Sequence, residues 1–125
     1  MPTSITITAG EAVLSAELND SPTARAIAEA LPIENSASRW GDEYYFPIDV
    51  HANGDNTPQR DVFSVGELGF WPPGNAFCVF FGPTPASHGN EPRMANPGIP
   101  IGRIRDDILP LLSMGPRVNI KLELS

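Results

Sequence analysis

Residues 66–85, GELGFWPPGNAFCVFFGPTP, place one Trp, four Phe and four Pro within twenty positions. The turn Pro72-Pro73-Gly74-Asn75 divides this stretch, because proline has no N–H to donate to a strand ladder. The flanking segments 66–71 and 76–81 are rich in aromatic and β-branched residues. They are therefore predicted to be neighbouring strands joined by a tight turn.

The strand predicted at 76–81 carries apolar side chains on both faces. Phe77 and Phe81 point one way, whereas Cys78 and Phe80 point the other way, because side chains alternate along a strand. A strand buried on both faces needs a core on one side and a covering element on the other. We expect a barrel interior on one side and a helix on the other. Trp71, at a strand end beside the turn, is equally compatible with core and cleft.

The remaining sequence adds further β segments and two helices. Alternating polar and apolar residues predict strands at 4–8, 12–18, 36–40, 43–48, 99–104 and 117–124. A helix is predicted from Pro22, with Asp20 or Ser21 as its cap and Pro32 as its end, and a single helical turn after Asp106 or Asp107. Residues 51–61 and 82–98 are predicted to be loops.

Eight short strands and two short helices, separated by Gly and Pro turns, predict a mainly β protein. A closed eight-stranded antiparallel barrel, forming a single domain over residues 1–125, is the expected architecture. Closure removes the strand edges that a β-rich chain would otherwise have to protect.

Composition limits the classes of function. The chain has 125 residues, with 15 acids against 8 bases and a net charge of −7, so a nucleic-acid partner is not expected. Neither a signal peptide nor a membrane-spanning run is visible, and the single Cys excludes an internal disulfide. We expect a cytoplasmic protein, monomeric or a small homo-oligomer, with no membrane partner.

Four segments together resemble the cyclophilin-like family of small bacterial and archaeal proteins of unknown function. They are LNDSPTARAIAEALPIE (18–34), RWGDEYYFPI (39–48), GELGFWPPGNAFCVFFGPTPAS (66–87) and the tail with IGRI (101–104) and GPRVNIKLE (115–123). The resemblance implies the barrel of the peptidyl-prolyl isomerases, with helices covering its ends.

The resemblance does not extend to the isomerase motifs. No Phe-His-Arg segment occurs in the chain, and Gln-Phe-Phe corresponds loosely to Cys78-Val79-Phe80-Phe81, without the Gln. Arg39 and Arg60 are the only plausible stand-ins for the catalytic Arg. Because a fold does not carry an activity with it, isomerase function is the alternative interpretation.

The leading hypothesis is a binding protein with a cleft at the barrel mouth for a small molecule or short peptide. Its aromatic candidates are Trp40, Tyr44, Phe70, Trp71, Phe77 and Phe81, and its polar candidates are Arg39, Arg60, Glu91 and Arg93. Catalytic residues stay unknown. A weaker third hypothesis is a domain that acts only through assembly.

No metal site or cofactor is expected. The run from Asp49 to Arg60 lacks the third-position Asp or Asn and the twelfth-position Glu of a calcium loop. His51 and His88 have no partner at zinc-ligand spacing, and Cys78 within an apolar strand is expected to be an inert thiol.

Overall fold

The computed structural model describes residues 2–125 and is mainly β. The strands are β1 (Thr3–Ala9), β2 (Ala12–Leu18), β3 (Ile33–Arg39), β4 (Glu43–Pro47), β5 (Arg60–Val62), β6 (Glu67–Trp71), β7 (Ala76–Phe80), β8 (Arg93–Ile104) and β9 (Arg117–Leu124). The helices are α1 (Pro22–Ala30) and α2 (Leu109–Leu112), and a 3₁₀ turn covers Pro72–Gly74.

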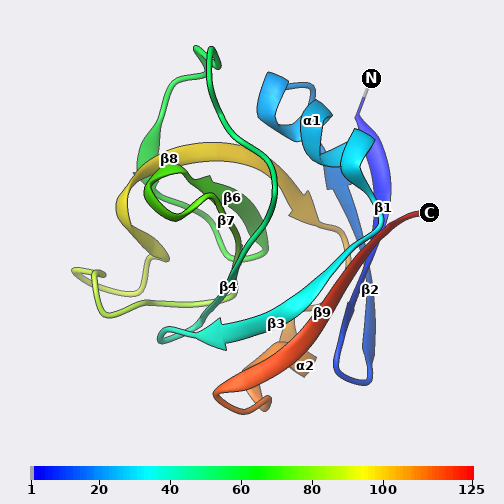
Figure 1. The fold of residues 1–125 in the computed structure, drawn as a ribbon. Coiled ribbons are helices and arrows are strands. Elements are labelled where there is room, and N and C mark those ends of the chain that lie inside the picture. The colour runs from blue at the N-terminus through cyan, green and yellow to red at the C-terminus, as the bar shows by residue number, and fades with distance from the viewer. Residues whose placement is uncertain (1) are drawn as a thin grey trace.

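Eight of these strands form a closed antiparallel ring (Figure 1). Their order around the ring is β2, β1, β9, β3, β4, β7, β6 and β8, and β8 pairs back onto β2, with Leu18 opposite Gly102. The predicted eight-stranded antiparallel ring is therefore confirmed. The short strand β5 is an addition to it, because it pairs only with β8 among the described elements.

The predicted loop at 82–98 is wrong in its second half. Residues 93–98 form the first part of the long strand β8, which pairs with β5 through Arg60 and Val62. Pro97 argues against a strand in the sequence, but proline is tolerated where pairing is irregular. The β5–β8 register is shifted between Arg60 and Val62, which is such an irregularity.

The interior of the ring is an apolar core. Aromatic side chains meet there in stacked pairs, with ring centroids 5.4 Å apart for Phe46 of β4 and Phe77 of β7, and 5.5 Å apart for Tyr44 of β4 and Phe81, the residue after β7. Ile27 of α1 and Leu111 of α2 are buried against this core. The two helices lie at opposite ends of the ring (Figure 1), as expected for this barrel.

The helix α1 begins as its sequence indicates. Pro22 is the first helical residue, and the Ser21 hydroxyl accepts a hydrogen bond from the Ala24 N–H at 3.2 Å. This satisfies one of the N–H groups that a helix start leaves without a partner. Of the two predicted caps, Ser21 is the one that the structure uses.

A second, smaller apolar cluster lies on the outer side of the same wall. Its buried members are Phe63, Ala76, Cys78, Phe80 and Met94. The covering elements are β8 with Met94 and the segment that follows β5 with Phe63, so the expectation of an outer helix is wrong. Met94 comes close because Gly69 lacks a side chain, and a Cβ there would lie 2.9 Å from Met94 Cε.

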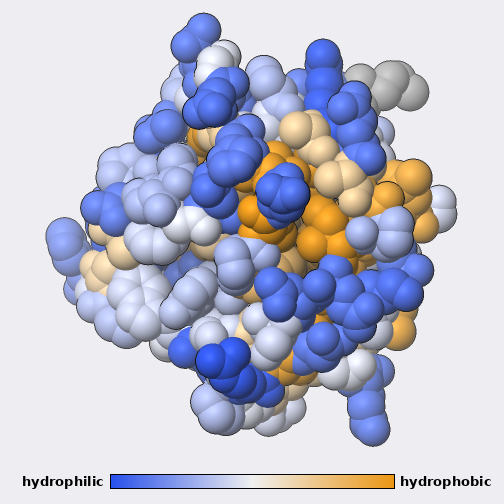
Figure 2. All heavy atoms as spheres, viewed as in Figure 1, coloured by the Kyte–Doolittle hydropathy of each residue, from blue (hydrophilic) through white to orange (hydrophobic). Residues whose placement is uncertain are grey.

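The surface of the ring is mixed in polarity. Figure 2 shows that hydrophilic side chains cover most of the visible face and that hydrophobic atoms are exposed near its centre. Within residues 2–125, no helix is long and apolar enough to cross a membrane.

Candidate functional site

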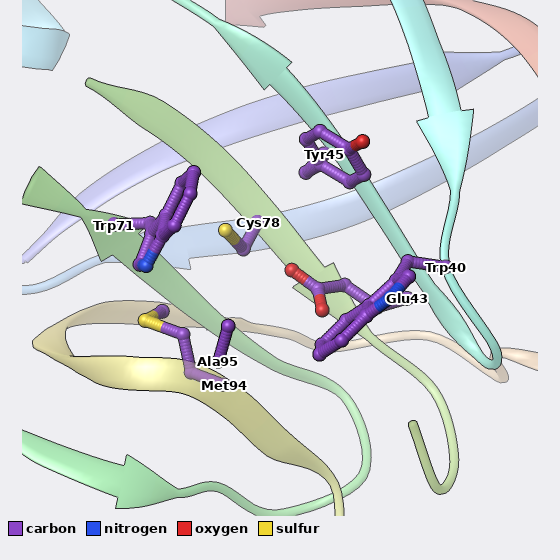
Figure 3. Close-up of a pocket in the computed structure, with 7 residues that line it drawn as sticks. All are labelled: Trp40, Glu43, Tyr45, Trp71, Cys78, Met94 and Ala95. Atoms are coloured by element: carbon purple, nitrogen blue, oxygen red, sulfur yellow. The ribbon is translucent and has the colours of Figure 1, made fainter. Parts of the chain in front are cut away.

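A pocket of about 270 Å³ opens on the outer face of the wall formed by β4, β7 and β6. Seven residues line it, namely Trp40, Glu43, Tyr45, Trp71, Cys78, Met94 and Ala95 (Figure 3). Both tryptophans of the chain are among them. The volume is just below the ~300–1,000 Å³ that is usual for drug-sized ligands, so the pocket suits a small group.

The alternation of β4 and β7 places three of these side chains together. Tyr44 points into the core, so its neighbours Glu43 and Tyr45 point outward. In the β4–β7 register, Tyr45 lies opposite Cys78 and Glu43 lies opposite Phe80. Side chains opposite each other in antiparallel strands share a face, which gathers the carboxyl, the phenol and the thiol on one patch.

Trp71 is positioned by the turn that follows β6. The chain enters the 3₁₀ turn Pro72–Gly74 directly after Trp71, and the indole packs against Gly74. A Cβ at Gly74 would lie only 2.7 Å from Trp71 Cζ3. The indole N–H donates to Asn96 Oδ1 at 3.3 Å, which ties the ring to β8.

Trp40 is positioned by the turn between β3 and β4. Its backbone N–H donates to the Glu43 carbonyl at 2.8 Å, and Gly41 has a φ of +63°, a conformation that favours glycine. A Cβ at Gly41 would lie 2.8 Å from Thr84 Cα, so the turn sits tightly against the segment after β7. Trp40 and Trp71 therefore stand on opposite sides of the Glu43 carboxyl and the Cys78 sulfur (Figure 3).

Glu43 is the unusual residue of the pocket. Its exposed fraction is only 3%, and within the described chain its Oε1 atom has no hydrogen-bond partner. Burial raises the pKa of Glu43 from 4.5 to about 8, although a hydrogen bond with Cys78 lowers it somewhat. The carboxyl is therefore mostly protonated at neutral pH, and perturbed acids in pockets are typical of functional sites.

Cys78 is buried and is a free thiol. Burial, together with the charge of Glu43, raises the pKa of Cys78 well above its usual value. Since the thiolate is the reactive form, this sulfur is a poor nucleophile at neutral pH. In the pocket the side chain packs beside Glu43, and its S–H donates to the Ala76 carbonyl at 3.8 Å.

The ten predicted ligand-binding residues fall into three groups. Trp40 and Trp71 line the pocket. The other aromatic candidates belong to the core inside the ring, with exposed fractions of 0–2%, and they are Tyr44, Phe70, Phe77 and Phe81. The Tyr44 hydroxyl donates to the Gly115 carbonyl at 2.5 Å. These four side chains build the wall, and the pocket lies behind it rather than at a barrel mouth.

The third group contains the charged candidates, and each of them is engaged in local structure. Arg39 donates to the carbonyls of Leu112 at 3.1 Å and Met114 at 2.6 Å, and to Asp42 at 2.7 Å. Its guanidinium also lies 5.0 Å from the Phe81 ring centroid. Arg39 thus joins the end of α2 to the turn that carries Trp40.

Arg60, Glu91 and Arg93 hold the outer strands. Arg60 pairs with Glu67 and lies 4.7 Å from the centroid of the Phe63 ring. Arg93 bridges Asp61 at 2.6 Å and Glu91 at 3.0 Å. Hydrogen bonds from the backbone of His88 lower the pKa of Glu91 to about 2, so this carboxylate organises its loop.

Sequence reasoning missed five of the seven lining residues. Part of the signal for Glu43 was available, because alternation along a strand places Glu43 and Tyr45 on the same face. That Cys78 faces them depends on the β4–β7 register, which the sequence does not specify. Met94 and Ala95 had no such signal, because their segment was predicted to be a loop. No group of three or more His, Cys, Asp or Glu in residues 2–125 could hold a metal ion.

Comparison with known proteins shows the family of this chain. The family model described as cyclophilin-like matches residues 3–123, and the chain belongs to that family. The solution structure of a hypothetical protein from Archaeoglobus fulgidus is similar, with a TM-score of 0.81 and 36% sequence identity. The alignment covers 99% of this chain and 95% of the archaeal chain. None of the curated proteins has a sequence that matches this one.

Proposed function

We propose that this cyclophilin-like protein binds a small molecule, or one side chain of a short peptide, in the outer pocket. The observation that supports this most is the convergence of both tryptophans and Glu43, with an unpartnered carboxyl oxygen, around a single cavity. A buried polar atom without a partner costs stability unless a ligand or water supplies one. Apolar walls with one directing polar group are typical of ligand sites.

Peptidyl-prolyl isomerase activity is the alternative. One observation favours it: Glu43 is protonated at neutral pH, and its O–H could donate to the amide nitrogen of a twisted X-Pro bond. The two arginines considered for that role, Arg39 and Arg60, already have acidic partners. Isomerase activity would need Glu43 to take the place of the catalytic Arg. Small-molecule binding needs no such substitute, so it is the preferred function.

The test of binding uses the two indole N–H resonances. In a ¹H–¹⁵N spectrum the chain has only two such signals, from Trp40 and Trp71, and both report on the pocket. The spectrum is followed during titration with small cationic, neutral and anionic compounds that carry an apolar group, and with Ala-Pro dipeptides. Saturable shifts of both signals are expected for at least one class.

The variant Ala95→Phe serves to block the pocket, because Ala95 is exposed and lines its edge. Its matched control is Val13→Phe, at an exposed position of β2 outside the pocket lining. The shifts should vanish in Ala95→Phe and persist in Val13→Phe. If no compound shifts either indole signal, the proposed function is wrong. Acceleration in a coupled proline-isomerisation assay that Ala95→Phe abolishes would instead favour the enzyme.

A further inference from the structure

The lining of the pocket is rich in aromatic rings and poor in positively charged side chains. Two indoles and the phenol of Tyr45 border the cavity. Among the described residues that line it, the ionisable ones besides Glu43 are Tyr45 of β4 and Cys78 of β7. The turn, β6 and β8 contribute Trp40, Trp71, Met94 and Ala95, which carry no charge. Aromatic faces attract cations, and Trp does so most strongly.

Glu43 lacks the counter-charge that a buried carboxylate needs. Arg39 of β3 pairs with Asp42, and Arg93, the neighbour of Met94 in β8, pairs with Asp61 and Glu91, so neither arginine serves as the partner of Glu43. An unpaired charge in such a site is unfavourable, so the carboxyl stays protonated while the pocket is empty. A cation from outside the chain would supply the missing partner.

The lining also selects among cations. An unsubstituted ammonium has three N–H donors, and each needs an acceptor when it is buried. The described pocket offers few acceptors, the Glu43 carboxyl and the Tyr45 hydroxyl, among otherwise apolar surfaces. An ammonium whose hydrogens are replaced by methyl groups has no donors to satisfy, and its methyl groups pack well against indole and Met94. The available volume of about 270 Å³ accommodates such a head group.

We propose that the ligand of this pocket carries an alkylated ammonium group, held between the indoles of Trp40 and Trp71, with the Glu43 carboxylate as its counter-ion. This inference rests on the proposed binding function and names its ligand class. The group could belong to a free organic cation or to a methylated lysine side chain of a peptide, since both present the same chemistry.

The proposal predicts a proton linkage. Binding of the cation favours ionised Glu43, so below its pKa each bound ligand releases one proton. Affinity then rises by about tenfold per pH unit up to about pH 8 and is constant above it. A neutral ligand that accepts a hydrogen bond from protonated Glu43 would show the reverse, with affinity falling above pH 8.

The decisive comparison is between choline and 3,3-dimethyl-1-butanol, which have the same shape but differ by a positive charge. Binding is followed by tryptophan emission, which reports only on Trp40 and Trp71. Choline is expected to bind at least ~10-fold more tightly at pH 8. A trimethyllysine peptide, with its unmethylated counterpart as control, identifies the source of the ammonium group. If the ligand is a peptide, the trimethyllysine peptide binds more tightly than choline, and if it is a free cation, choline binds more tightly than the peptide.

The variant Glu43→Gln keeps the shape of the side chain and removes its charge. It should lower choline affinity by about tenfold or more and abolish the pH dependence, while leaving the affinity for the alcohol within about twofold. If the alcohol binds as well as choline, or if choline affinity does not rise with pH, the ligand class is wrong while pocket binding stands. If neither compound nor any in the wider panel perturbs the indoles, the proposed function itself fails.

Discussion

The two faces of the β4–β7 wall differ sharply, although they are built from alternate residues of the same strands. On the inner face, Phe46 and Phe77 stack and are fully buried. On the outer face, Glu43 and Cys78 are also buried, but they border a cavity and a carboxyl oxygen lacks a partner among the described residues. The inner face is thus arranged for stability, whereas the outer face retains an unfavourable arrangement, which under the proposed function a ligand relieves.

The largest effect is expected from truncating the inner face. Phe77→Ala removes a fully buried ring and leaves a cavity, which should lower the free energy of unfolding by about 3–5 kcal/mol. Trp71→Ala, on the half-buried outer rim, should cost about 1–2 kcal/mol. Urea denaturation measures both values. Equal losses would show that the outer face is as much a packed core as the inner face.

The next effect concerns pH. The pKa of Glu43 is about 8 in the folded protein against 4.5 when solvated, so the carboxyl stays protonated up to a higher pH in the folded state than in the unfolded state. The associated stability is complete below pH 4.5, falls as the pH rises toward 8 and is constant above it. Because the side chain is only 3% exposed, the loss should reach a few kcal/mol.

Urea denaturation between pH 5 and pH 9 measures this slope. Glu43→Gln should flatten it, since the amide does not titrate, whereas Glu29→Gln, at an exposed position of α1, should leave it unchanged. A slope that survives in Glu43→Gln would mean that other groups carry the pH dependence and that the outer face is not under electrostatic strain.

The smallest effect on stability is expected at Gly74. Gly74→Ala places a Cβ 2.7 Å from the Trp71 ring, so the indole must move away from its present position. Unfolding free energy should change by less than ~1 kcal/mol, while choline affinity falls several-fold. Gly115→Ala is the matched control, because a Cβ there meets nothing within 4 Å. Unchanged affinity in Gly74→Ala would show that the orientation of Trp71 is unimportant.

The comparison also explains which parts of the site were predictable. Alternation is a local property, so the faces of Phe77 and Cys78 follow from sequence alone. The partner of Cys78 does not, because it depends on the β4–β7 register that places Tyr45 opposite it. The charged candidates illustrate the same limit. The sequence predicts that Arg39 directs a ligand, whereas in the structure its guanidinium donates hydrogen bonds to carbonyls at the end of α2.

The sequence by itself determined the strand periods, the proline and glycine turns and the start of α1, because these depend on residues close together in the chain. It also indicated a closed ring, because an open sheet of eight short strands would expose unpaired edge strands and closure removes them. Only the tertiary structure decided that β8 crosses the outer wall and encloses a cavity over Glu43. The cavity depends on contacts between segments that are distant in the chain, such as Met94 packed over Gly69. The protonation of the Glu43 carboxyl depends on its burial, which is also a property of the tertiary structure.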